Sequence, residues 1–226
     1  MDTDAASSKT AYEKMITSFS NGEYDILVGT QMVAKGLDFP NVTLVGVLNT
    51  DQALYADDYR SYERAFSLLT QVVGRSGRGS QKGMAVIQTY TPDNMIIGMA
   101  AKQDYNAFYE MELALRRAQG YPPFGDLVSI TFIGQEEARV IRGAAKFRDS
   151  LLELGKQPQY AKENYTVLGP APCAVPKINY NFRYQLTLRC RMTRNLRLLL
   201  AHLLREFSKD KVNRGVSAFV DVNGYD

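Results

Sequence analysis

The first 120 residues alternate amphipathic helical patterns with short, continuously apolar runs. In KTAYEKMITSF the side chains of Tyr12, Ile16 and Phe19 recur at helical spacing, which predicts a helix. The segment SYERAFSLLTQVV predicts another helix, with Ser61 as its cap. The runs YDILVGT, VTLVGVLNTD and GMAVIQTY predict buried strands. Such strands between helices favour a parallel sheet covered on both faces, with ligands at the carboxyl ends of the strands.

A different order of elements follows YPPFGD, residues 121–126, whose two prolines end a helical segment predicted over roughly residues 93–119. Strands are predicted in DLVSITFIG, YTVLGPAP, YNFRYQLTLRCR and VSAFVDV, the second of which breaks at proline. Helices are predicted in EEARVIRGAAKFRDSLLEL and RNLRLLLAHLLREF. The order β-α-β-β-α-β is that of a split βαβ, or ferredoxin-like, sandwich. We therefore predict an α/β domain over residues 1–120 and an α+β domain over residues 121–226.

Composition adds that the chain is an ordinary globular protein of 226 residues, 45% apolar and 23% charged. No apolar run is long enough for a transmembrane helix, and the polar amino end MDTDAASSK is unlike a signal peptide. Residues 1–120 hold 11 Lys and Arg against 14 Asp and Glu, whereas residues 121–226 hold 16 against 10. This asymmetry indicates that the second domain faces an anionic partner.

The cysteines offer no zinc site of the usual kind. Cys173 and Cys190 form no CxxC pair, and His202 is the single histidine, so the chain cannot supply four ligands. Buried free thiols are the simpler interpretation of both cysteines.

A candidate phosphate-binding face lies in QVVGRSGRG, residues 71–79. In a helix or helical turn, Gln71, Arg75 and Arg78 would project from one face, because they follow at spacings of four and three residues. Arginine stays charged and forks onto phosphate oxygens, while glycines such as Gly74 let the backbone approach a ligand closely. A solvated basic turn, or an Arg/Gly-rich loop on RNA backbone, is the alternative.

A second polar stretch, GTQMVAKGLDFP over residues 29–40, follows a predicted strand. Thr30 and Lys35 could hold a nucleic-acid phosphate with the help of backbone N–H groups. Asp38 could accept a hydrogen bond from a ribose hydroxyl or orient an arginine. Alternatively, Asp38 and Pro40 are no more than turn residues.

The second domain concentrates arginine in one stretch. Arg183, Arg189 and Arg191 share the polar face of a predicted strand, and Arg194 and Arg197 open the next helix. Interleaved tyrosine and phenylalanine residues suit a surface that contacts nucleic-acid backbone and stacks on bases. The alternative is a solvated charged face, with the aromatic side chains filling the core.

Several of these motifs together resemble those of a known enzyme class. GTQMVAKGLDFP resembles motif V of superfamily 2 helicases, and QVVGRSGRG resembles their motif VI. With DQALYADDYRSYER between them, and YPPF and LGPAPCAVPK followed by FRYQL after them, the chain resembles the primosomal protein N′ family of bacterial replication-restart helicases. The resemblance runs through essentially the whole chain. It implies that the first domain is part of the second RecA-like lobe of a helicase.

The resemblance also implies roles for the candidate residues of the first domain. Arg78 would be an arginine finger that reaches the triphosphate of ATP bound on the other lobe, with Arg75 beside it. ATP binding and coupling would fall to Gln71, Gly74, Asp38 and Asp51. Contacts with DNA would come from Thr30, Gln31 and Lys35.

In the second domain the resemblance implies two kinds of contact. DNA would be contacted by Lys177, in a loop between strands, and by Arg183, Arg189 and Arg191. Arg194, and after it Arg197, would capture the acidic tail of single-stranded DNA-binding protein, which ends in an aromatic residue and a free carboxylate.

Parts of such a motor are missing from the sequence. It has no G-x-x-x-x-G-K-[ST] loop, no D-E-x-H box and no cysteine-rich zinc insertion. We therefore expect a carboxyl-terminal fragment of an ATP-dependent 3′-to-5′ DNA helicase for replication restart, inactive alone, whose full-length protein uses ATP, Mg²⁺ and zinc. Another superfamily 2 repair translocase, or a non-catalytic binding module with a degenerate lobe, is the alternative.

The expected partners follow from the same resemblance. They are branched and single-stranded DNA, single-stranded DNA-binding protein and other primosome proteins, with no membrane involved. The expected location is the bacterial cytoplasm, in association with the nucleoid.

Overall fold

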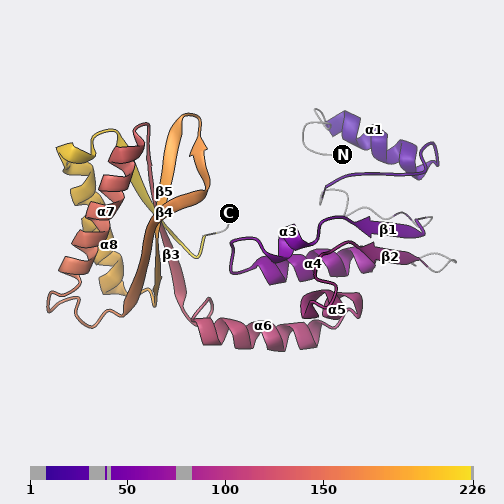
Figure 1. The fold of residues 1–226 in the computed structure, drawn as a ribbon, viewed down its shortest axis with the longest axis horizontal. Helices are drawn as coiled ribbons and strands as arrows, with labels where there is room; N and C mark the ends of the chain where they lie inside the picture. The colour runs from indigo at the N-terminus through magenta and orange to yellow at the C-terminus, as the bar shows by residue number, and fades with distance from the viewer. Residues whose placement is uncertain (1–8, 31–38, 40–41, 75–82, 225–226) are drawn as a thin grey trace. The chain divides into compact units, whose positions relative to one another are not determined.

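The computed structural model describes residues 9–30, 39, 42–74 and 83–224 (Figure 1). The chain divides into two compact units, unit 1 (Met1–Glu112) and unit 2 (Leu113–Asp226). Each unit has a hydrophobic core of its own. None of the helices in the described ranges combines the length and the apolar character that crossing a membrane requires.

Unit 1 contains a two-stranded parallel sheet and several helices. Its elements are α1 (Lys9–Ser20), β1 (Leu44–Val47), α3 (Asp51–Leu54), α4 (Ser61–Val73), β2 (Met84–Ile87), α5 (Met95–Ala101) and the start of α6 (Tyr105–Gln119). β1 and β2 pair in parallel, with Leu44 opposite Met84 and Val47 opposite Ile87. The predicted parallel sheet in a mixed α/β unit is therefore confirmed.

Three local predictions for unit 1 are wrong. Residues 24–30, predicted as a strand, form neither helix nor strand among the described residues, because an apolar run needs a pairing neighbour to become one. Ser61 is the first residue of α4 and Arg60 occupies the cap position, so Ser61 does not cap the helix. The segment predicted as one helix is two, α5 and α6, because Gln103 adopts a left-handed backbone with φ of 54° between them.

The core of unit 1 is built mainly by helices. Phe66 of α4 stacks on Phe108 of α6, with 4.1 Å between the ring centroids and 7° between the ring planes. The two strands contribute less, since Leu44, Met84 and Val86 are each at least half exposed. Burial of these strands on both faces, as predicted, is therefore not found in the described part of the unit.

Unit 2 is a four-stranded antiparallel sheet with two long helices on one side (Figure 1). Its elements are β3 (Asp126–Gly134), α7 (Glu137–Leu154), β4 (Tyr165–Ile178), β5 (Asn181–Cys190), α8 (Arg194–Lys209), the short 3₁₀ helix η1 (Lys211–Asn213) and β6 (Val216–Val222). The strands lie in the order β4-β5-β3-β6. This order, with the chain order β-α-β-β-α-β, confirms the predicted ferredoxin-like sandwich.

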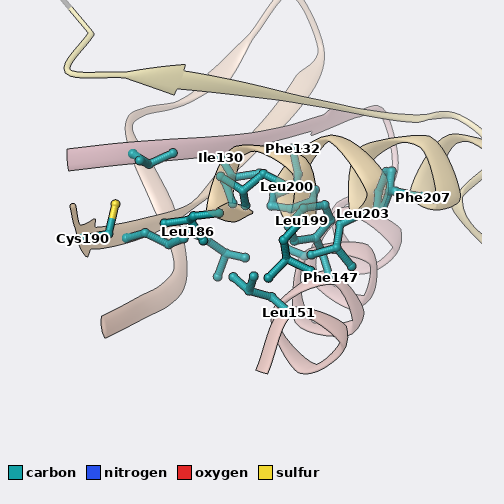
Figure 2. Packing of buried hydrophobic residues seen from close by; sticks show 14 of the residues in the cluster. Ile130, Phe132, Phe147, Leu151, Leu186, Cys190, Leu199, Leu200, Leu203 and Phe207 are labelled. Atoms are coloured by element: carbon teal, nitrogen blue, oxygen red, sulfur yellow. The ribbon is translucent and has the colours of Figure 1, made fainter. Parts of the chain in front are cut away.

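The core of unit 2 lies between the sheet and helices α7 and α8 (Figure 2). Alternate residues of β3 and β5 point into it: Val128, Ile130, Phe132, Leu186, Leu188 and Cys190. The rings of Phe132, Phe147 and Phe207 pack edge to face, with centroids 5.4 to 6.0 Å apart. Because both helices cover the same face, the residues between these core positions line the opposite, open face of the sheet.

β4 is longer than the sequence predicts. The strand continues through three prolines to Ile178 instead of breaking at the first. It lies at the edge of the sheet, and its register with β5 shifts after Leu168 and again after Pro172. Proline lacks the N–H that a strand donates, and edge strands and bulges are the places that tolerate this loss.

Candidate functional site

Asp51 connects the segments that leave the two strands of unit 1. It is the first residue of α3, shortly after β1, and its carboxylate accepts hydrogen bonds from residues that follow β2. The donors are Thr89 Oγ1 at 3.0 Å, Thr91 Oγ1 at 3.1 Å and the backbone N–H of Tyr90 at 2.9 Å. The family resemblance pointed to Asp51 itself, but no prediction concerned the two threonines, of which Thr89 lies in the predicted strand GMAVIQTY and Thr91 just after it.

These hydrogen bonds lower the pKa of Asp51 below its ordinary value. The backbone N–H of Tyr90 is the largest cause, and desolvation opposes it. The carboxylate is therefore charged at neutral pH and is engaged locally. The Asp51 carboxylate joins the segments that follow two neighbouring parallel strands, at the edge where ligands of such sheets gather, and its part in nucleotide coupling stays a prediction.

Gln71 and Gly74 lie at the carboxyl end of α4. The exposed Gln71 donates its side-chain N–H to Ser67 Oγ at 3.1 Å, one turn earlier. Gly74 is the cap residue, and a Cβ there would lie 3.2 Å from the side-chain nitrogen of Gln103. The space left by the absent side chain of Gly74 is therefore occupied by Gln103, which also belongs to unit 1. That a ligand approaches Gly74 stays a prediction.

Five predicted site residues lie outside the described residues: Gln31, Lys35, Asp38, Arg75 and Arg78. α4 extends to the residue before Gly74, so the described helix leads directly into the arginine motif. Thr30 is described and exposed, at the end of the segment that forms no strand. The roles of all six residues stay predictions.

The open face of the sheet in unit 2 carries Arg183 and Arg189, which alternate with the core residues of β5. Arg189 donates to the Tyr121 hydroxyl at 3.2 Å, and its guanidinium lies 5.2 Å from the centroid of the same ring. Arg183 donates to the carbonyl of Val175 at 3.4 Å. In the part of the chain that the structure describes, neither guanidinium pairs with a carboxylate, so both can meet an external anion.

Acidic residues are absent from a long stretch around these arginines. Residues 164–205 contain seven Lys and Arg and no Asp or Glu. Asp221 of β6 lies on the same open face, but β3 separates β6 from β5. The strands β4 and β5 themselves therefore carry basic residues and no acidic ones.

Two predicted placements in this basic region need correction. Arg191 follows Cys190, the last residue of β5, so it is exposed beyond the strand instead of sharing its polar face. Lys177, predicted in a loop, lies in β4, because that strand extends further than the prolines suggested. Its Nζ is 4.3 Å from the centroid of the Phe182 ring.

A small apolar groove of about 160 Å³ lies between α8 and β6, and Arg197 lines it. The remaining lining residues are Met192, Leu200, Ala201, Leu204, Val220 and Val222. Arg194, the first residue of α8, is exposed but does not line this groove. A guanidinium beside apolar side chains suits a ligand that combines a carboxylate with an aromatic ring.

No direct signal in the sequence indicated the groove or the role of Tyr121. The groove residues look like ordinary apolar positions of α8 and β6, and only their packing leaves them partly open. Tyr121 belongs to the YPPF stretch, which sequence reasoning used as a domain boundary. Its stacking on Arg189 could have been suspected only from the known pairing of arginine with aromatic rings.

Both cysteines are buried thiols, Cys173 in β4 and Cys190 in β5. Burial raises the pKa of the Cys190 thiol to about 11, with the nearby carboxylates of Asp126 and Glu163 adding to the shift. Within the described ranges, no group of three or more His, Cys, Asp or Glu side chains is placed to hold a metal ion.

Two family models match the chain. The helicase conserved C-terminal domain matches residues 3–80, which include β1, α3, α4 and the arginine motif. The primosomal protein N C-terminal domain matches residues 117–225, which include the complete ferredoxin-like sandwich.

Curated relatives resemble the chain along nearly its full length. Replication restart protein PriA of Bacillus subtilis (strain 168) is 40% identical over 225 residues, which are 100% of this chain and 27% of the relative. Replication restart protein PriA of Chlamydia muridarum is 37% identical over 223 residues, 99% of this chain and 28% of the relative. The chain thus spans little more than a quarter of the length of these two relatives. From the two family matches and these identities together, we conclude that the chain belongs to the PriA family of replication restart proteins.

Proposed function

We propose that this chain is part of an ATP-dependent 3′-to-5′ DNA helicase that restarts stalled replication forks. The observation that carries the proposal is the succession, in one chain, of a helicase C-terminal domain match and a primosomal protein N C-terminal domain match. In this proposal residues 1–120 supply half of a motor, and residues 121–226 supply a domain that binds DNA and partner proteins. The protein acts in the bacterial cytoplasm, with other primosome proteins as further partners.

The motor half acts through its two helicase motifs. Arg78 is the proposed arginine finger, with Arg75 beside it, and such a group is worth about 10³–10⁵ in the rate of phosphoryl transfer. The nucleotide network is proposed to include Gln71, Gly74, Asp38 and Asp51, and the DNA contacts Thr30, Gln31 and Lys35. ATP and Mg²⁺ belong to the complete motor, and zinc to a part of it outside this chain.

The motor assignment is tested by Arg78→Ala in a longer protein in which a first helicase lobe precedes this chain. DNA-stimulated ATP hydrolysis should fall by about 10³-fold or more, because the transition-state charge loses its partner. DNA affinity should stay within about twofold. Arg142→Ala, which removes an exposed cation of α7, is the matched control and should leave hydrolysis unchanged.

Two results would contradict this assignment. One is normal turnover by the Arg78→Ala protein, which would leave the lobe as a scaffold without a catalytic arginine. The other is DNA-stimulated phosphate release by the 226-residue chain alone, since the proposal gives this chain only half of the nucleotide site.

For unit 2 we propose that Lys177, Arg183, Arg189 and Arg191 contact DNA backbone. The lack of acidic residues over 164–205 and the open face of β5 support this proposal. Arg189→Gln should weaken binding of single-stranded and branched DNA and lower the salt dependence, log K against log salt, by about one unit of slope. Arg142→Gln should change neither quantity, and salt-insensitive binding by the parent chain would rule out a phosphate-tracking face.

The groove beside α8 is the proposed site for the tail of single-stranded DNA-binding protein. Its lining favours Arg197 over Arg194 as the residue that meets the terminal carboxylate. Arg197→Ala should weaken binding of an acidic peptide with an aromatic carboxyl-terminal residue about tenfold or more, whereas Arg194→Ala should cost less than about threefold. If neither change alters the affinity, the groove does not bind the tail.

A further inference from the structure

One end of the sheet in unit 2 brings together three loops that none of the assigned roles uses. Gly134, the last residue of β3, pairs with Phe182 near the start of β5 and with Val216 at the start of β6. The turn that follows β3, the β4–β5 hairpin turn and the turn that precedes β6 therefore meet at this end. We call it the hairpin end of unit 2.

The hairpin end contains a polar cavity of about 370 Å³. Its lining residues are Gln135, Glu136, Arg139, Asn181, Arg214 and Gly215. Arg139 is committed within the molecule, because its Nε lies 2.8 Å from a carboxylate oxygen of Glu136 and its Nη1 donates to the carbonyl of Arg214 at 3.3 Å. Two guanidinium groups against one carboxylate leave the cavity with a net positive charge.

The side chain of Arg214 is available to a ligand. It is exposed, and across the described residues its guanidinium forms no ion pair and donates no hydrogen bond. Arginine forks onto phosphate or carboxylate oxygens, and the amide of Asn181 adds a neutral hydrogen-bonding group to the same cavity. The cavity thus has the charge and the donors of a site for one anionic group.

Tyr180 stands beside this cavity on the hairpin turn. Ile178 of β4 pairs with Asn181 of β5, so Asn179 and Tyr180 form a two-residue turn. Both have left-handed backbones, with φ of 47° and 65°. Asparagine is common at such positions, but a bulky aromatic residue rarely adopts this conformation.

The ring of Tyr180 does not pack against the core of unit 2. Phe182 and Tyr184, which follow it at alternate positions, pack against the buried cluster of unit 2, whereas Tyr180 is 84% exposed. A strained backbone that projects a large aromatic ring into solvent indicates a contact with something outside the chain. Lys177 lies at the same tip, and the carboxylate in the cavity lining, Glu136, is paired with Arg139.

We propose that the hairpin end is a binding site for one nucleotide unit of single-stranded DNA, in which Tyr180 stacks on a base and Arg214 binds the adjoining phosphate. The proposal rests on the DNA-binding function proposed for unit 2 and adds a contact away from the open face of β5. An exposed aromatic ring next to a cationic cavity is the combination that single-strand binding proteins use, because every base has a π-face and every nucleotide a phosphate. A purely apolar protein partner would leave the charge of Arg214 uncompensated.

The chain contains no tryptophan, which permits a direct test with the complete 226-residue chain. Tyr180→Trp places a single indole at the tip of the turn. Titration with a thymidine oligonucleotide of about 15 nucleotides should quench its emission in a saturable way, and added salt should reverse the quenching. Fluorescence anisotropy of a labelled oligonucleotide, recorded in parallel, measures binding independently of the indole.

Substitutions separate stacking from other effects at the same position. Tyr180→Asn removes the ring while keeping a residue that tolerates the left-handed turn, and should weaken single-strand binding roughly fivefold to a hundredfold. Tyr180→Phe keeps the ring and should stay within about twofold of the parent. Arg214→Gln should weaken binding and reduce the salt slope by about one unit, while the matched control Arg142→Gln should do neither.

The possible outcomes distinguish the hairpin-end site from the general DNA-binding function proposed for unit 2. Anisotropy that shows DNA binding while the indole emission of the Tyr180→Trp protein stays unchanged would overturn the hairpin-end site and leave the DNA-binding function of unit 2 intact. Quenching by an acidic peptide but not by the oligonucleotide would overturn it in favour of a protein contact. Absence of any DNA binding by the parent chain would remove both.

Discussion

Units 1 and 2 differ in how completely they bury their own apolar surface. In unit 2, both helices cover one face of a complete four-stranded sheet, and Phe132 and Leu186 are fully buried between them. In unit 1, the two parallel strands leave apolar side chains such as Leu44 and Val86 at least half exposed. Parallel sheets are normally covered on both faces. Unit 2 is therefore stabilised by contacts within its own core, whereas the sheet of unit 1 would gain stability from a further surface that covers its exposed apolar side chains.

The largest expected contrast comes from truncating one strand residue in each unit. Phe132→Ala removes a ring that packs against Phe147 and Phe207, and should lower the free energy of unfolding of unit 2 by about 3–5 kcal/mol. Val86→Ala in β2 should cost less than about 1 kcal/mol, because the side chain is half exposed. Hydrogen exchange of the strand amides in increasing denaturant measures both. A large cost at Val86 would show that its face of the sheet is covered in solution, and the contrast would disappear.

Thiol reactivity reports on unit 2 alone, since both cysteines lie in its strands. Burial and the raised pKa of Cys190 keep its thiol protonated at neutral pH. A thiol reagent should therefore modify the native protein roughly a hundredfold more slowly than the urea-unfolded protein. Rapid modification under native conditions would mean that the sandwich opens readily, against the internal stability inferred for it.

The helix caps provide a matched pair of smaller effects. Thr193 Oγ1 accepts from the N–H of Leu196 in unit 2, and Asn94 Oδ1 accepts from the N–H of Ile96 in unit 1. Thr193→Ala and Asn94→Ala should each cost about 1 kcal/mol. Thr193→Ser and Asn94→Asp keep an acceptor and serve as controls in the same denaturation experiment. An effect at one cap only would show that the other helix is not stabilised by its cap.

The smallest expected effect is the loss of stability of unit 1 when the Asp51 carboxylate is protonated at acidic pH. Its folded pKa is lowered, so its stabilisation of unit 1 is complete above the ordinary value of 3.8 and is lost as pH falls through the folded pKa. The amide of Tyr90, which donates to this carboxylate, should titrate by NMR with a midpoint below 3.8. Asp51→Asn should abolish that titration. A midpoint at or above the ordinary value would mean that the threonine and backbone donors do not hold the carboxylate in solution.

Much of this fold was predictable where the pattern along the chain was complete. The bounds of α4, β3 and β6 agree with the predicted segments, because each combines a clear period with polar or turn residues at its ends. Prediction failed at residues 24–30 and in β4. The first has the composition of a strand but no described partner to pair with, and the second contains prolines that an edge position tolerates.

For the candidate site, the sequence predicted which charged residues to consider but not the residues that surround them. The family resemblance pointed to Asp51, whereas the alternation of charged and apolar positions, which is visible in the sequence, pointed to the arginines of β5. The partners that decide their environment, such as Thr89 for Asp51 and Tyr121 for Arg189, are distant along the chain and depend on tertiary packing. The groove beside Arg197 and the exposed ring of Tyr180 also depend on tertiary packing, so no sequence pattern predicted them.

The claim that unit 2 is stable and binds DNA by itself is tested most directly by comparing residues 117–226 with the complete chain. We expect the isolated segment to unfold in one cooperative transition, because its core is complete. It should bind single-stranded DNA within about threefold of the affinity of the complete chain at the same salt concentration, with the same salt slope. Loss of cooperative unfolding, or loss of DNA binding in the isolated segment, would contradict the account.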